Sequence, residues 1–343
     1  MNIYRLLKVY QRIRSPRVKL MGILLLHITR RRYINLYLDP VMACNLRCRM
    51  CYFSNDVERQ SLGGRFSDDD IEAIDRAMFH RVIKLQIGCG AEPTVYPKLP
   101  ELVQRARHRG IPFISVTTNG NLLTAEKMQQ LVEAGLSELT ISAHGMTKAT
   151  YEHLMQRASF DRFLALIDIL RDVRHSHPDF RIRLNYTVNE DNIDELPLLC
   201  RLFADVVPDV VQIRPIQRLG QTDYDNFSLT RIKERYDDCI LPVVRFMEEH
   251  GATCLYPTLQ HLQTLEAGVD EEPRNSEIDL LPYFNLSPYP DWRNDKIDPY
   301  TETFEDYCHR THRTRRMLKA LLGIKTDGDT GKDRTLGLNY QVK

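Results

Sequence analysis

Candidate strands and helices alternate along this chain from residue 34 to about residue 250. The candidate strands cover 34–39, 82–88, 113–118, 138–143, 180–188 and 210–216. The candidate helices cover 68–80, 98–109, 124–134, 147–174, 193–206 and 229–250. Alternating β and α units are typical of a parallel sheet whose strands are joined by helices. The chain is therefore predicted to be an α/β protein with six βα units.

Polar residues recur at every second position of these strands, unlike in fully buried parallel strands. The strand at 180–188 reads Ile182, Arg183, Leu184, Asn185, Tyr186, Thr187 and Val188. Since successive side chains point to opposite faces, one face is apolar and the other is a polar lumen. A packed barrel would fill its lumen with branched apolar residues. We therefore expect an open, partial (β/α)6 TIM-type barrel, and Arg183 and Arg214 in its lumen indicate a polar or anionic substrate.

Three cysteines, Cys44, Cys48 and Cys51, follow the first candidate strand with the spacing C-x3-C-x2-C. Three thiolates this close can each ligate one iron of a 4Fe–4S cluster. The fourth iron would lack a cysteine ligand and could bind a small molecule, as the open position of a catalytic metal site does. A disulfide and a zinc site are the alternatives. The first needs an oxidising compartment, although no secretion signal is recognised, and the second needs a fourth ligand.

The triplet resembles the signature of the radical S-adenosylmethionine (radical SAM) superfamily. The resemblance implies that S-adenosyl-L-methionine binds the open iron and is reductively cleaved. The resulting 5′-deoxyadenosyl radical would abstract hydrogen from the substrate. It also implies an external electron donor similar to flavodoxin or ferredoxin. Whether the reaction is that of an oxidoreductase, a transferase or a lyase stays open.

The run Gly90, Ala91, Glu92 and Pro93 follows the second candidate strand and resembles the Gly-Gly-Glu motif of this superfamily. There the backbone of the motif contacts the methionine amino group of the cofactor. Ala91 replaces the second glycine and forbids backbone angles that glycine allows. The resemblance implies that this run contacts the cofactor, with a backbone that differs from that of a glycine at position 91.

Further cofactor contacts are implied at the ends of the next strands, by Asn119, Ser142, Asn185 and Arg214. Asn119 precedes a glycine, so an ordinary turn is its alternative role. In relatives, the serine contacts the ribose or carboxylate, the asparagine contacts the ribose or methionine, and groups near the arginine face adenine. His144 takes a place that is often acidic in relatives and is interpreted as a loop histidine, with a proton donor or a metal ligand as its alternative roles.

Within the cysteine loop, the residue before the third cysteine is often aromatic in the family and lies near adenine. Here this residue is Met50, and Tyr52 follows the cysteine. A thioether can pack on a purine, so Met50 and Tyr52 are both candidate cofactor contacts.

Residues 1–33 form a basic segment, and the first 38 residues contain nine Lys and Arg but no Asp or Glu. Ser15 and Pro16 predict the start of a helix there. Its apolar run is too short to span a bilayer, which takes about 20 residues. The segment is expected either to lie on an anionic membrane surface or to pack on the catalytic domain.

Residues 34–254 are predicted to form the radical SAM barrel, and 255–343 an irregular arm with a basic helix. Only Cys308 follows Cys254, so the cysteine-rich SPASM extension of many relatives is not expected. The net charge of +1 does not favour a nucleic-acid partner.

We expect a radical SAM enzyme that is cytoplasmic. Peripheral association with the inner face of the membrane is the alternative. Its substrate is expected to be a small or lipid-linked molecule. A peptide- or RNA-modifying enzyme and a non-catalytic homologue that binds the cofactor are the alternatives.

Overall fold

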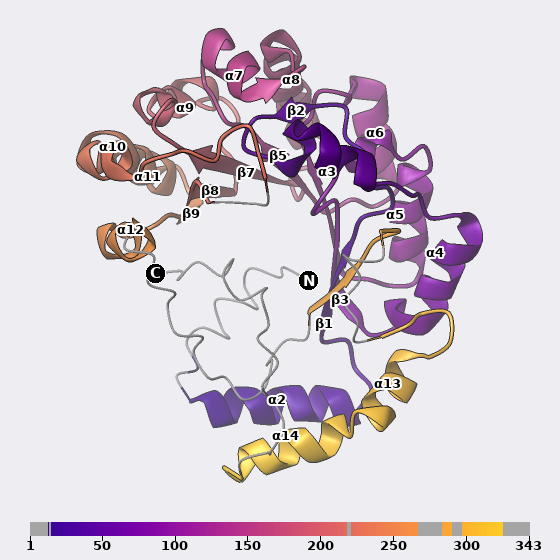
Figure 1. The fold of residues 1–343 in the computed structure, drawn as a ribbon. Helices are drawn as coiled ribbons and strands as arrows, with labels where there is room; N and C mark the ends of the chain where they lie inside the picture. The colour runs from indigo at the N-terminus through magenta and orange to yellow at the C-terminus, as the bar shows by residue number, and fades with distance from the viewer. Residues whose placement is uncertain (1–12, 14, 218–220, 267–282, 290–296, 325–343) are drawn as a thin grey trace.

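The computed structural model describes residues 13, 15–217, 221–266, 283–289 and 297–324. Expectations for residues 1–12 and for the end of the chain after residue 324 lie outside this part. All the strands of the main sheet are parallel, and helices cover its outer face (Figure 1).

The six predicted strands are confirmed, with bounds that differ by at most one residue. They are β1 (Ile34–Leu38), β3 (Val82–Ile87), β4 (Phe113–Thr118), β5 (Glu138–Ser142), β7 (Arg181–Val188) and β8 (Val210–Pro215). Two strands that the sequence did not predict extend the sheet at its edges, β9 (Thr253–Leu255) and β10 (Tyr283–Leu286). The order is β10-β1-β3-β4-β5-β7-β8-β9. Among the described residues no pairing joins β9 to β10, so the barrel is open.

Helices and single turns connect the strands. The α-helices are α2 (Pro16–Ile28), α3 (Asp56–Ser61), α4 (Asp68–Ile74), α5 (Leu99–His108), α6 (Ala125–Glu133), α7 (Lys148–Leu154), α8 (Phe160–Ser176), α9 (Leu198–Leu202), α10 (Thr230–Glu234), α11 (Leu241–Glu249), α12 (Leu259–Glu266), α13 (Phe304–Arg310) and α14 (Arg313–Leu321). The side chains of Ser15, Ser67 and Thr124 cap α2, α4 and α6, as expected from residues that accept hydrogen bonds from a first helical turn.

The predicted helix 193–206 is reduced to a 3₁₀ turn (Ile193–Glu195) and α9, and 229–250 is divided into α10, a π-helical turn (Tyr236–Ile240) and α11. A third predicted helix, 147–174, is interrupted. Its middle forms the short strand β6 (Met155–Gln156), which pairs antiparallel with β2 (Arg47–Cys48) of the cysteine loop. Arg157 then takes a positive φ of 71°, which a helix does not tolerate, and Ser159 caps α8. Because β6 pairs with β2, the break in the helix fixes the position of Cys48 in the cysteine loop.

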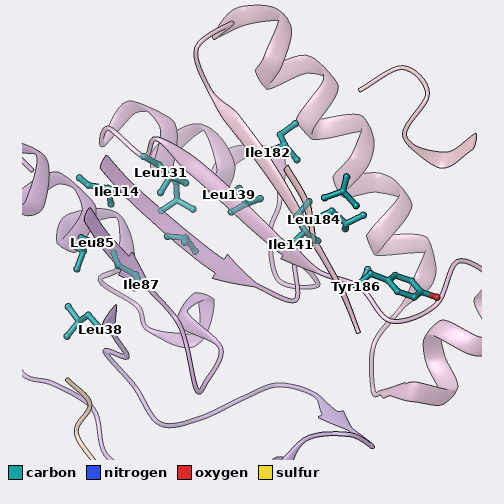
Figure 2. Packing of buried hydrophobic residues seen from close by; sticks show 14 of the residues in the cluster. Leu38, Leu85, Ile87, Ile114, Leu131, Leu139, Ile141, Ile182, Leu184 and Tyr186 are labelled. Atoms are coloured by element: carbon teal, nitrogen blue, oxygen red, sulfur yellow. The ribbon is translucent and has the colours of Figure 1, made fainter. Parts of the chain in front are cut away.

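The core lies between the apolar face of the sheet and the surrounding helices. Leu139, Ile141, Ile182 and Leu184 are fully buried there, and Figure 2 shows them on neighbouring strands beside the helices. In β7 buried residues alternate with partly exposed ones over the whole strand. The expected division into an apolar outer face and a polar lumen is therefore present in this strand.

Helices α2 and α14, from opposite ends of the chain, lie side by side below the barrel in the view of Figure 1. The buried side of α2 consists of Leu20, Ile23 and Leu24. His27 accepts or donates hydrogen bonds at both ring nitrogens, 3.0 Å from Tyr33 Oη and 2.9 Å from Thr314 Oγ1. Within the described ranges no helix has both the length and the apolar character required to cross a membrane.

Candidate functional site

The loop between β1 and α3 carries all three cysteines of the triplet. Cys44, Cys48 and Cys51 are partly buried and form no disulfide. The amide of Cys51 donates to the carbonyl of Cys48 at 2.9 Å, and the amide of Leu46 donates to Cys44 Sγ at 3.4 Å. The local hydrogen bonds and the β2–β6 ribbon thus hold three free thiols on one short loop.

Burial raises the pKa of Cys44 to about 12, and it also raises the pKa of Cys48 and of Cys51. The charges of Cys51 and Cys44 contribute to the rise at Cys48, so the three sulfurs lie within electrostatic reach of one another. Iron ligation would deprotonate these thiols, because thiolates are the ligands.

In the part of the chain that the structure describes, no three His, Cys, Asp or Glu side chains surround the position of a single metal ion. A cubane cluster instead needs thiolates at separate corners. Three thiols with no fourth partner among the described residues therefore fit a 4Fe–4S cluster better than a structural zinc ion.

Asp39, at the end of β1, organises the loop that follows β3. Its carboxylate accepts hydrogen bonds from the amides of Cys89 at 2.7 Å, Gly90 at 3.0 Å and Ala91 at 3.4 Å. The side chain is 6% exposed. Burial raises the pKa of Asp39, and the three backbone donors oppose that rise. Asp39 was not predicted from the sequence, although a carboxylate directly after a buried strand is a signal of a polar site.

Gly88 is the residue of this loop that requires glycine. Its φ is +84°, and an added Cβ would lie 2.5 Å from the carbonyl oxygen of Thr117 and 2.6 Å from Pro93 Cγ. Ala91 does not have a positive φ. The replacement of the second motif glycine by Ala91 therefore causes no backbone strain.

Glu92 connects this loop to the end of β4. Its Oε1 accepts hydrogen bonds from the hydroxyl of Thr118 at 2.6 Å and from the amide and hydroxyl of Thr94 at 3.1 and 2.5 Å. Its Oε2 accepts from the amide of Asn119 at 2.8 Å. The amide of Glu92 in turn donates to the carbonyl of Ala43, next to the first cysteine. The carboxylate, 3% exposed, is thus a structural hub.

Two side-chain contacts join the cysteine loop to the strand ends. Asn119 Nδ2 donates to Asn45 Oδ1 at 2.9 Å, and the hydroxyl of Tyr52 donates to the carbonyl of Gly90. Burial raises the pKa of Tyr52, so the phenol stays a neutral donor. The predicted residues Tyr52, Gly90 and Asn119 are therefore brought together around the cysteine loop.

Met50, also in the cysteine loop, is 7% exposed, and its Sδ lies 3.0 Å from Asn189 Nδ2. Asn189, in the loop after β7, is fully buried and was not predicted. Its contact links the cysteine loop to the far side of the barrel mouth.

The remaining predicted residues lie on β5, β7 and β8. Ser142 and Asn185 are register partners on adjacent strands, and the amide of Ala143 donates to the carbonyl of Asn185 at 3.0 Å. Arg214 Nη2 donates to Gln212 Oε1 at 3.0 Å, and Asn185 Oδ1 accepts from Arg183 Nε at 3.2 Å. The side chains of Asn185 and Arg214 are thus already tied to lumen neighbours.

His144 follows β5 and accepts a hydrogen bond at Nδ1 from the amide of Thr187 at 3.1 Å. Burial, with a contribution from Arg214, lowers the pKa of His144 to about 4. The ring is therefore neutral at pH 7, with its proton on Nε2. In the described structure it positions the strand end.

Comparison with known proteins places these features in a family. The model of the "Radical SAM superfamily" matches residues 40–202, which contain the cysteine loop and the strands from β3 to β7. A tungsten-containing aldehyde ferredoxin oxidoreductase cofactor-modifying protein of Pyrococcus furiosus is 26% identical over 52% of this chain and 50% of its own length. A GTP 3′,8-cyclase of Xanthomonas campestris is 32% identical, over 48% of this chain and 49% of its own length. The chain therefore spans about half the length of these curated relatives.

Solved structures share the fold. Streptococcus suis SuiB bound to S-adenosylmethionine has a TM-score of 0.55 at 15% identity, over 74% of this chain and 58% of that one. The anSMEcpe protein with bound AdoMet and the Cp18Cys peptide has a TM-score of 0.55 at 15% identity, over 85% and 84%. At these identities the likeness establishes the open barrel. The cysteine loop and the family match lead to one conclusion: the part of the chain from residue 40 to residue 202 belongs to the radical SAM superfamily.

Proposed function

We propose that this chain is an enzyme that binds a 4Fe–4S cluster through Cys44, Cys48 and Cys51 and cleaves S-adenosyl-L-methionine reductively. The observation that carries the proposal is the loop of three free thiols. This loop is joined to the Gly90–Glu92 segment through Tyr52 and the amide of Glu92. When bound, the cluster and cofactor would supply the electron and the adenosyl radical that abstracts hydrogen from a substrate. An external donor of the flavodoxin or ferredoxin type would supply that electron.

The cofactor would lie across the carboxyl ends of the strands, where ligands bind in parallel α/β barrels. The residues proposed to contact it are Met50, Tyr52, Gly90, Ala91, Glu92, Pro93, Asn119, Ser142, Asn185 and Arg214. In the loop after β3, Asp39 already uses the amides of Gly90 and Ala91. The methionine ammonium group would therefore be bound by carbonyl oxygens of this loop, which are acceptors.

Reduced, cluster-loaded protein is expected to convert S-adenosyl-L-methionine into 5′-deoxyadenosine and methionine, slowly even without substrate. Anaerobic incubation with dithionite and mass spectrometry of the products measures this. The same protein without dithionite is the control, since cleavage needs the electron. If an intact cluster gives only methylthioadenosine, or no cleavage, the chain is a cofactor-binding homologue and the enzymatic proposal fails.

The substrate is proposed to be polar or anionic, because the lumen face of β7 carries Arg183, Asn185 and Thr187. The names of similar proteins include both GTP cyclases and, in Bradyrhizobium diazoefficiens, a PqqA peptide cyclase. A peptide- or RNA-modifying activity is therefore the second candidate. Product analysis with candidate substrates of each class distinguishes them.

We also propose, more specifically, that the substrate is linked to a lipid. This proposal depends on one exposed surface. We call this the α2–α14 surface, and its large apolar residues are Val18, Met21, Leu25 and Ile28 of α2, Leu318 of α14, and Leu322, which directly follows α14. The residues of α2 repeat every three or four positions and so share one side of the helix. Arg17, Arg315 and Arg316 are exposed on the same two helices. Apolar side chains flanked by cations suit the inner, anionic face of a membrane.

The variant Met21→Gln/Leu25→Gln/Leu322→Gln is expected to lose binding to anionic vesicles by roughly tenfold or more, because it removes exposed apolar area that would enter the lipid. Co-sedimentation at low salt measures this. The buried face of α2 is unchanged, so the fold should persist. Leu198→Gln, an exposed leucine of α9, is the matched control. Should the unaltered protein ignore anionic vesicles, the lipid-linked substrate loses its support.

A further inference from the structure

Two arginines from neighbouring strands meet inside the barrel. Arg183 of β7 and Arg214 of β8 both donate a hydrogen bond to the same oxygen, Gln212 Oε1. Gln212 is 4% exposed, and its amide oxygen carries no formal charge. Two guanidinium groups are thus held together around a neutral acceptor. Like charges in this arrangement repel, and an anion between them would relieve the repulsion.

A third cation, Lys84 of β3, lies on the same side of the sheet. Its Nζ is 5.7 Å from the centroid of the Phe113 ring, and none of the ion pairs within the described ranges involves it. Burial lowers the pKa of Lys84, and the positive charge of Arg183 also lowers it. The two cations therefore repel each other. Glu138, 1% exposed, acts in the opposite direction and favours the charged form of Lys84.

The surroundings of these cations are polar and incompletely hydrogen-bonded. The hydroxyl oxygens of two residues on the polar face of β4, Ser115 Oγ and Thr117 Oγ1, are buried and have no hydrogen-bond partner in the described structure. Ser115 is 0% exposed. Buried hydroxyl groups normally have a partner, so these two indicate a missing polar ligand. Across the lumen, the charges of Arg183 and Arg214 reach the phenol of Tyr37 and oppose the rise in its pKa that burial causes.

We propose that Arg183 and Lys84 bind a phosphoryl group of the substrate inside the barrel, next to Arg214, whose proposed contact is with the cofactor. This inference rests on the proposed function, because it assigns the lumen below the cofactor to the substrate. A phosphoryl group carries up to two negative charges and three acceptor oxygens. A carboxylate carries one charge and two oxygens. A guanidinium group together with an ammonium group matches the dianion better, and planar guanidinium forks suit its oxygens.

Calorimetric titration of the cluster-loaded full chain, with S-adenosyl-L-methionine present, tests this with inorganic phosphate and, separately, with acetate. Phosphate is expected to bind, and Arg183→Gln and Lys84→Gln are each expected to weaken it roughly tenfold or more, because each removes charge-assisted hydrogen bonds. The matched control is Arg171→Gln, an exposed arginine on α8 that pairs with Asp168. It should bind phosphate as the unaltered protein does.

Three results would overturn the inference: no phosphate binding by the unaltered chain, unchanged phosphate affinity in both lumen variants, or acetate binding as tight as phosphate. The last would assign the site to carboxylates. Two variants on different strands protect the test against misfolding of one, and thermal unfolding of each identifies a misfolded protein. Phosphate binding requires no cofactor cleavage. A failure here therefore leaves the 5′-deoxyadenosine result standing, and failure of that result leaves phosphate binding standing.

Discussion

The variant Cys44→Ala/Cys48→Ala/Cys51→Ala is expected to lose all cluster binding. The unaltered protein, reconstituted anaerobically, should hold about four irons per chain, and the triple variant should hold almost none. The cause of the loss is chemical, because alanine offers no ligand and no group of three His, Cys, Asp or Glu side chains surrounds a metal position in the described structure. Iron and sulfide assays measure the loss. Electron paramagnetic resonance of the reduced protein should show a signal that changes on cofactor addition only when the cysteines are present.

Cys89→Ala is the matched control for the cluster experiment. Cys89 follows β3 directly, and its thiol is free and exposed. Its amide, which bonds to Asp39, is unaffected by the substitution. This variant should retain the full iron content. If the triple variant kept the cofactor-sensitive signal, or Cys89→Ala lost it, the ligand assignment would be wrong.

Glu92→Gln is expected to lower the free energy of unfolding by about 2–4 kcal/mol. The reason is that an amide NH₂ would replace one carboxylate oxygen at a site where every neighbour donates. At Oε2 it would meet the amide of Asn119, and at Oε1 the hydroxyl and amide of Thr94 and the hydroxyl of Thr118. One buried donor would be left unpaired in either orientation. Denaturant unfolding measures the loss of stability.

Cofactor binding should fall in Glu92→Gln as well, because Glu92 joins the loop after β3 to β4 and, through its amide, to Ala43 of the cysteine loop. Iron content should be retained, since the substitution leaves the three thiols in place. Glu101→Gln, an exposed glutamate on α5, is the control and should change neither quantity. A Glu92→Gln protein of normal stability and cofactor affinity would show that the hub is not required.

Local sequence determined most of the barrel. The six central strands were predicted because apolar and polar residues alternate with the period of a strand between capped helices. The same local information located the cysteine triplet and the run from Gly90 to Pro93. These features need only neighbouring residues, so a single sequence suffices to find them.

Contacts between distant residues decided the rest. β10 pairs with β1 across some 250 positions, and β6 exists because Met155 pairs with Cys48. Neither pairing has a local signal, since a two- to four-residue strand is stabilised by its partner and not by its own propensity.

The same division holds for the site. The sequence by itself determined the family, the parallel architecture and the three cysteines, because periodicity and spacing are local. Only the tertiary structure decided that Asp39 accepts hydrogen bonds from the amides of the loop after β3. The same is true of the hydrogen bonds that Arg183 and Arg214 both donate to Gln212 Oε1. Hydrogen bonds of this kind depend on which strand ends become neighbours in space. That is decided when the apolar face of the sheet is buried against the helices and the polar side chains are enclosed in the lumen.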